Sequence, residues 1–87
     1  MVLNIKNNKL FKVRKQYELS QLEARLLSLF ANNKFNTYND IKKYVYKKDI
    51  DNSLIEKEIV ILENKYCLEL SHNNYGARVR NKIYIDY

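Results

Sequence analysis

SLIEKEIVILENKY, residues 53–66, is the stretch of this sequence that decides the fold. At about 100° per residue, its apolar side chains form one stripe, made of Ile55, Ile59, Leu62 and Tyr66. The nearly opposite side is a narrow, mostly polar ridge of Ser53, Lys57, Val60 and Asn64. The spacing predicts an amphipathic helix that buries one side in a core and presents the other outward.

Two shorter helices are predicted before this one, and each opens with a capping box. In Ser20 with Glu23, and in Thr37 with Asp40, a hydroxyl and a carboxylate can satisfy free backbone amides at the helix start. The first helix should end near Asn32-Asn33, because Asn tolerates the left-handed conformation of helix C-termini. The core-facing residues expected from both helices are Leu22, Leu26, Leu27, Leu29, Phe30, Ile41, Tyr44 and Val45.

The connections between the predicted helices are short. Residues 49–52 form a brief loop, after which Asn52 or Ser53 can cap the third helix. Helices joined this closely pack as one cluster, and a chain of 87 residues is the length of one small domain. We therefore expect residues 1–87 to be a single domain.

The apolar pattern has period two in residues 2–19, which predicts a small antiparallel sheet. Asn7-Asn8 and Lys15-Gln16 are interpreted as its turns. Phe11 and Val13 share one strand face, and Lys and Asn side chains fill the other. This polar face indicates an edge position in the fold.

A second period-two segment follows the third helix. Leu68 and Leu70 begin one strand of a hairpin, and residues 77–87 return as the other. The only glycine, Gly76, falls where a hairpin tip needs a residue free to take positive φ. Three cations alternate with apolar residues on the return strand and are expected to share one face: Arg78, Arg80 and Lys82.

The chain is basic, with 16 Lys and Arg against 10 Asp and Glu and a formal charge of +6. This charge favours polyanionic partners, chiefly nucleic acid or an anionic membrane surface, although a basic domain without such a partner is the alternative. No stretch approaches the roughly 18 apolar residues of a membrane span, and the N-terminus has no signal-peptide pattern. We expect a cytoplasmic protein that does not bind a membrane.

The sequence contains no recognisable catalytic constellation. It has no glycine-rich phosphate loop, no paired nucleophile and base, and no metal-ligand spacing. The single cysteine, Cys67, excludes an internal disulfide and is interpreted as a reduced, partly buried thiol. His72 is interpreted as a surface-loop residue rather than a metal ligand. We expect a binding module, not an enzyme, with no cofactor and no metal.

Strands, three helices and a basic hairpin follow one another in the order of a winged helix-turn-helix, an α+β fold. In that fold the third helix enters the major groove of DNA. We assign base contacts to Lys57 (guanine), Asn64 (adenine) and Val60 (thymine methyl), and a phosphate contact to Ser53. Phosphate contacts from the hairpin wing and the second helix are assigned to Arg78, Arg80, Lys82, Tyr38, Lys42 and Lys43.

The charge of the third helix supports a different interpretation. Its three Glu residues outnumber its two Lys residues, so the alternative function is a winged-helix protein-interaction module. In that case the acidic helix, with Val60 and Ile61, docks a protein partner. RNA binding through the hairpin is a third alternative. Lys57 and Asn64 can also be plain solvated residues, and the hairpin cations can simply protect a strand edge.

Several short motifs resemble the C-terminal effector domain of OmpR/PhoB-type response regulators. Leu19-Ser20-Gln21-Leu22-Glu23, followed by Leu26-Leu27, is similar to the family's Leu-Thr-x-x-Glu start of the first helix. Thr37 to Tyr46 is similar to the family's second helix, and Asp49 to Asn52 to the Asp-rich loop that follows it. Ile59 with Leu62 matches the Ile-x-x-Leu of the third helix, and Ile83-Tyr84-Ile85 occupies the end of the wing. The sequence departs from the family in lacking an Arg in the third helix and the glycine pair of the wing.

This resemblance implies a transcription regulator that binds tandem half-sites of double-stranded DNA, often as a homodimer. It would be the effector domain of a two-component response regulator or a stand-alone relative. The segment Lys47 to Asn52 would then face RNA polymerase or a neighbouring protomer.

Overall fold

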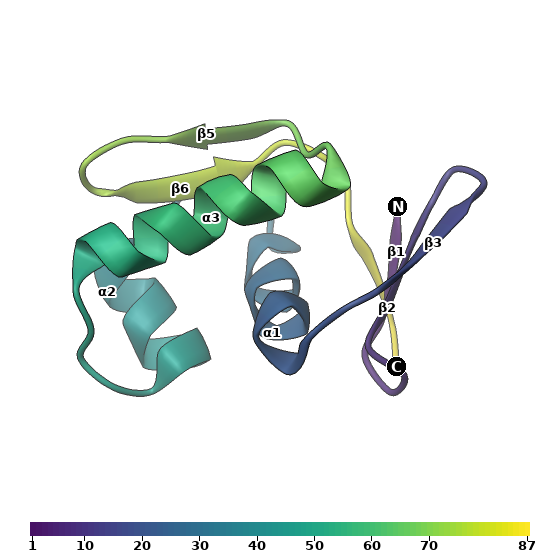
Figure 1. Cartoon of the computed structure of the whole chain (residues 1–87), viewed down its shortest axis with the longest axis horizontal. Coiled ribbons are helices and arrows are strands. Elements are labelled where there is room, and N and C mark those ends of the chain that lie inside the picture. The colour runs from purple at the N-terminus through teal and green to yellow at the C-terminus, as the bar shows by residue number, and fades with distance from the viewer.

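The computed structural model describes all residues from 1 to 87 and contains two small sheets and three helical segments (Figure 1). In chain order the elements are β1 (Val2–Asn4), β2 (Lys9–Lys12), β3 (Lys15–Glu18), α1 (Gln21–Phe30), β4 (Asn36–Thr37), α2 (Tyr38–Ile41) continued by the π-helix η1 (Lys42–Tyr46), α3 (Asn52–Tyr66), β5 (Leu70–His72), β6 (Gly76–Val79) and β7 (Tyr84–Asp86). The predicted α+β class, with strands before and after three helices, is confirmed.

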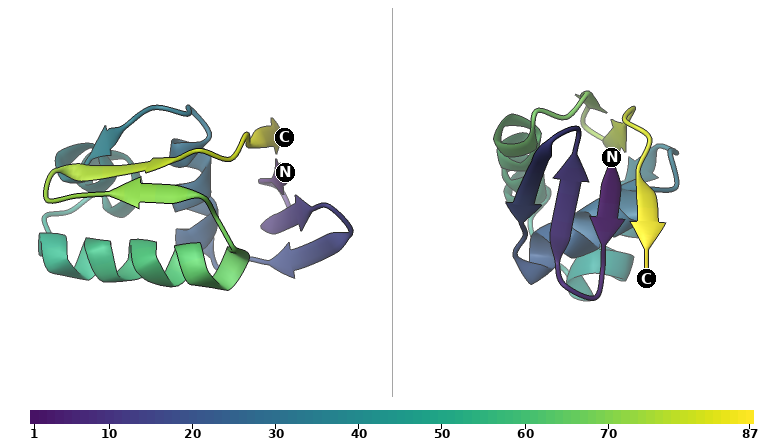
Figure 2. Two further views of the ribbon diagram at one scale, coloured as in Figure 1. Left: turned by 90° about the horizontal axis from the view of Figure 1, so that it is seen from above. Right: turned by 90° about the vertical axis from the view of Figure 1, so that its right-hand side faces the viewer.

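The two sheets have different topologies (Figure 2). One has the order β3-β2-β1-β7, and its last pair is parallel. The other has the order β4-β6-β5 and is antiparallel. The prediction of one return strand over residues 77–87 is therefore wrong. The chain leaves β6 after Val79, buries Ile83 in the core, and pairs the last strand with the free edge of β1.

The N-terminal strands pair in a register that the sequence pattern only partly predicts. The turn at Asn7-Asn8 is confirmed, with Asn8 at φ 52°. The turn expected at Lys15-Gln16 is wrong, because Lys15 pairs with Lys12 and leaves Val13-Arg14 as the loop. This register buries Leu10 completely. Phe11 faces outward and is 38% exposed.

The two predicted capping boxes are confirmed. Ser20 Oγ accepts from the Glu23 amide, and the Glu23 carboxylate accepts from the Ser20 amide. Thr37 and Asp40 make the same reciprocal pair at the start of α2. These local bonds set where two of the three helices begin.

The second helix widens into a π-helix over Lys42–Tyr46, which the sequence pattern does not predict. Its i→i+5 turn keeps Val45 buried but rotates Tyr44 away from the core. Tyr44 is 56% exposed, so its predicted inward position is wrong. The third helix begins one residue early: Asp51 is its N-cap and makes no side-chain cap bond, so capping by Asn52 or Ser53 is also wrong.

The apolar stripe of α3 is buried in the central core as predicted: Ile55, Ile59, Leu62 and Tyr66 are each at most 1% exposed. Polar bonds hold the end of α3 to its neighbours. The Tyr66 hydroxyl donates to the Glu23 carboxylate over 2.9 Å. Lys12 Nζ donates to the carbonyls of Tyr66 and Cys67 over 3.2 and 2.6 Å. The Cys67 side chain is exposed, contrary to the partly buried thiol expected.

Gly76 has a different role from the one predicted. Its φ is not positive. A Cβ at this position would lie 2.1 Å from the Asn36 carbonyl oxygen and 2.7 Å from Thr37 Cα. The absence of a side chain therefore allows β4 to approach β6 closely.

None of the helices has the length and apolar character needed to cross a membrane.

Candidate nucleic-acid interface

The outward ridge of α3 lies where the sequence predicted it. Ser53, Lys57 and Asn64 are exposed, and Val60 is partly buried. At 15 residues, the helix is about 22 Å long, enough to cross a major groove about 12 Å wide. The ridge thus offers one cation, one amide, one hydroxyl and one aliphatic side chain along a helix of suitable length.

The carboxylates of α3 lie at the sides of this ridge. Glu56 is on the hairpin side, with an oxygen 3.8 Å from His72 Nδ1. Glu58 lies near Tyr46, at the end of the second helix. Burial raises the pKa of Tyr46, and the negative charge of Glu58 raises that pKa further. The Tyr46 hydroxyl is buried without a hydrogen-bond partner. Lys57 is the one cation among the four residues of the ridge.

The three hairpin cations are all exposed but do not share one strand. Arg78 lies in β6 between Ala77 and Val79, whose side chains are fully buried, so it faces outward. Arg80 follows β6, and its backbone amide donates to the Glu69 carbonyl over 2.7 Å. Lys82 lies in the connection to β7. The expected single return strand that carries all three cations is wrong, because β6 ends at Val79, before both Arg80 and Lys82.

The hairpin runs alongside α3 (Figure 2, left), and its tip touches the start of α2. The Tyr38 hydroxyl donates to the Asn73 carbonyl over 2.9 Å, and the Tyr38 amide donates to the Tyr75 carbonyl over 2.9 Å. Tyr38 is only 3% exposed. Its predicted phosphate contact is therefore wrong, because its side chain joins the hairpin to the core.

The lysines of the second helix form a cluster with those of the following loop. Lys42 is partly buried and pairs with Asp49 at 3.3 Å. Lys43 is exposed, with its Nζ 5.3 Å from the centroid of the Tyr44 ring. These side chains border a depression of about 410 Å³ lined by Asn39, Lys42, Lys43, Lys47, Lys48 and Asp49. Lys42 is less available to an external anion than Lys43, because Asp49 already neutralises it.

Sequence reasoning did not assign the cations at the β2–β3 tip, which the fold places beside the end of α3. A recess of about 290 Å³ is lined there by Lys12, Val13, Arg14, Lys15, Tyr17 and Cys67. The missed signal is charge segregation, since the first 17 residues contain five Lys and Arg and no Asp or Glu.

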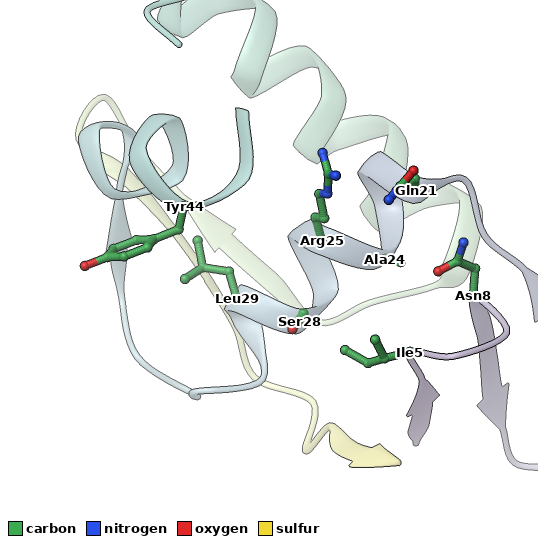
Figure 3. Close-up of a pocket in the computed structure, with 8 residues that line it drawn as sticks. All are labelled: Ile5, Asn8, Gln21, Ala24, Arg25, Ser28, Leu29 and Tyr44. Atoms are coloured by element: carbon green, nitrogen blue, oxygen red, sulfur yellow. The ribbon is translucent and has the colours of Figure 1, made fainter. Parts of the chain in front are cut away.

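The hollow between the four-stranded sheet and α1 has a different character (Figure 3). It measures about 460 Å³ and is lined by Ile5, Asn8, Gln21, Ala24, Arg25, Ser28, Leu29 and Tyr44. Half of this lining is apolar, and Arg25 is its single charge. No group of three or more His, Cys, Asp and Glu side chains in the structure could hold a metal ion.

No protein-family model matches this chain, and comparisons with curated proteins and with solved structures find no match either.

Proposed function

We propose that this chain is a winged-helix DNA-binding domain that acts in transcriptional regulation, as the OmpR/PhoB-type effector domains that it resembles do. The observation that carries the proposal is the division of α3 into a buried face and an exposed face. This helix buries its apolar stripe and leaves Ser53, Lys57 and Asn64 exposed along its length.

The arrangement of the neighbouring elements supports this proposal. Strand β4, between α1 and α2, pairs with β6 and so ties the β5–β6 hairpin to the helices. The hairpin then lies beside α3, as a wing lies beside a recognition helix. A reading helix and a basic hairpin held in fixed relation can contact a groove and its flanking backbone together.

The residues divide into two roles. Lys57 donates to guanine, Asn64 pairs with adenine, and Val60 contacts a thymine methyl group. Phosphate contacts come from Ser53 and from the exposed cations Arg78, Arg80, Lys82 and Lys43, with a smaller contribution from the paired Lys42. Duplex DNA is the partner, bound by two copies on tandem half-sites, with Lys47 to Asn52 facing RNA polymerase. No reaction, cofactor or membrane enters this proposal.

Selection of bound sequences from a random duplex pool tests the reading role of α3. Lys57→Ala and Asn64→Ala should each relax preference at one base pair by about 1–3 kcal/mol. Lys6→Ala and Asn7→Ala are matched controls, because both residues are exposed in the β1–β2 turn. An unchanged base preference in both α3 variants would show that the helix does not read DNA.

The backbone contacts have a separate measurement. The Arg78→Ala/Arg80→Ala variant should bind all sequences more weakly and with a smaller salt dependence, since each lost phosphate contact lowers the log–log slope by about 0.9. A salt titration that coincides with wild type would remove the hairpin from the interface.

A second candidate function, docking of a protein partner, is supported by two exposed apolar side chains on one side of α3. Leu54 is 56% exposed and Ile61 is 44% exposed. With the flanking carboxylates they suit a protein partner better than a phosphate backbone. Titration of the folded domain with mixed-sequence duplex DNA at low salt separates the two functions: no binding favours protein docking.

A further inference from the structure

The β2–β3 hairpin belongs to the most cationic part of the chain. The first 17 residues hold Lys6, Lys9, Lys12, Arg14 and Lys15 without a single Asp or Glu. None of these cations takes part in the ion pairs of the structure. No carboxylate of the protein therefore neutralises their charge.

The tip of this hairpin is fixed against the C-terminal end of α3. Lys12 Nζ donates to the Tyr66 and Cys67 carbonyls, which end the helix. Strand β3, at the edge of its sheet, lies on the α3 side of that sheet (Figure 2, right). The recess beside Cys67 joins the helix end to Arg14 and Lys15. The tip and the end of α3 thus form one continuous surface.

The C-terminal end of a helix repels DNA phosphates. Its unpaired carbonyls and macrodipole place about half a negative charge there. In this protein Lys12 covers two of those carbonyls, and the exposed Arg14 and Lys15 add positive charge just beyond them. The hairpin tip therefore converts an electronegative helix end into a cationic one.

Val13, at the tip, is 96% exposed with φ 55°. A β-branched residue in this left-handed conformation is strained. The backbone holds the Val13 side chain in solvent, next to Arg14. An apolar tip beside cations suits a sugar-phosphate backbone, because the cations meet the phosphates and the isopropyl group meets the sugar.

We propose that Val13, Arg14 and Lys15 form a second backbone-binding element, which grips the duplex beyond the C-terminal end of α3. This inference rests on the proposed DNA binding, and its ligand is the phosphodiester backbone of double-stranded DNA. The element adds affinity without base preference, since it reaches phosphates rather than base edges.

The Arg14→Ala/Lys15→Ala variant tests this element in the full chain. Both side chains are exposed, so circular dichroism should show an unchanged fold. Two lost phosphate contacts should lower the salt-dependence slope by about 1.8, and weaken binding of a mixed-sequence duplex roughly 10- to 60-fold at about 0.1 M salt. The bases selected from a random pool should stay the same.

The matched control is Lys6→Ala/Lys34→Ala, which removes the same charge elsewhere. Lys6 lies in the turn at the opposite end of β2, and Lys34 lies in the α1–β4 connection, on the far side from α3 (Figure 2). At about 0.1 M salt, charges more than about 10 Å from the DNA are largely screened. The control should therefore bind almost as wild type does.

Cys67, the only cysteine and exposed beside the recess, reports contact independently of affinity. Saturating duplex should slow its alkylation in wild type, and less so in Arg14→Ala/Lys15→Ala. If wild type binds DNA and the tip variant matches the control in slope and protection, this inference is overturned while the proposed function stands. If wild type does not bind duplex DNA even at low salt, both are overturned.

Discussion

At the scale of single residues, Gly76 shows how one missing side chain positions the hairpin. The Asn36 carbonyl oxygen occupies the space that a Cβ would need. Gly76→Ala should push β4 away from β6 and destabilise the domain by about 3 kcal/mol, the upper range for overpacking a tight site. Urea unfolding monitored by circular dichroism measures this change.

Ser71→Ala is the control for Gly76→Ala, because Ser71 is exposed on the neighbouring strand β5. It should leave the free energy of unfolding within about 0.5 kcal/mol of wild type. Equal stability of the Gly76→Ala variant and wild type would contradict the role of close approach.

Glu23 gives the domain a predictable response to acid. Burial tends to raise its pKa, but the Ser20 amide, the Tyr66 hydroxyl and Lys65 donate hydrogen bonds that together lower the pKa below its ordinary value of 4.5. Because its folded-state pKa is lowered, the Glu23 carboxylate stabilises the protein above about pH 4.5. This contribution to the free energy of unfolding is lost as the pH falls through the folded-state pKa. Glu23→Gln should therefore flatten the stability profile below about pH 4.5.

Urea unfolding of wild type and Glu23→Gln measures this difference. The measurements run from about pH 3 to about pH 7, a range that spans the ordinary pKa of a Glu carboxyl. Glu69→Gln is the control, since Glu69 is exposed and forms no ion pair in the structure. A Glu23→Gln profile parallel to that of wild type would contradict the assignment.

At the scale of elements, Lys12 is one of the residues that attach the end of α3 to the N-terminal sheet, beside the Tyr66 hydroxyl, which donates to the Glu18 carbonyl over 3.5 Å. Lys12 bonds two carbonyls at the helix end, where a cation also interacts favourably with the macrodipole. Lys12→Met keeps the aliphatic stem and removes the charge, so it should destabilise the domain by about 1–2 kcal/mol. Hydrogen exchange should quicken most in the last turn of α3.

Lys9→Met is the matched control, because Lys9 lies on the same strand and makes no side-chain hydrogen bond or ion pair in the structure. It should leave the exchange of α3 amides unchanged. Equal effects of the two substitutions would indicate that only net charge matters.

At the scale of the whole molecule, the two ends of the chain complete one sheet. β7 pairs in parallel with β1, with the Ile5 amide donating to the Asp86 carbonyl over 3.1 Å. Removing residues 84–87 should expose the edge of β1 and the partly buried Ile85, lowering stability by about 3 kcal/mol. Removing Tyr87 alone, which is 86% exposed, should have little effect.

Urea midpoints and hydrogen exchange of the β1 amides distinguish these two truncations. Unchanged exchange in β1 after loss of residues 84–87 would show that β7 does not support the sheet.

Features that depend on near neighbours in the chain were predictable from sequence. The apolar stripe of α3 and both capping boxes involve residues three or four positions apart, so helical geometry alone brings them together. The exposed ridge of Ser53, Lys57 and Asn64 follows from the same periodicity. The hairpin cations were found but wrongly placed on one strand, because Arg80 and Lys82 lie beyond the end of β6.

The sequence by itself determined the α+β class, the start of two helices and which side of α3 enters the core. Tertiary structure alone decided the pairing of β7 with β1, the burial of Tyr38 and the place of Arg14 and Lys15 beside α3. The physical reason is contact distance along the chain: a helix is stabilised within a few residues, whereas strand partners and register depend on burying residues far apart in sequence. The composition of the surface surrounding α3 is therefore a property of the fold.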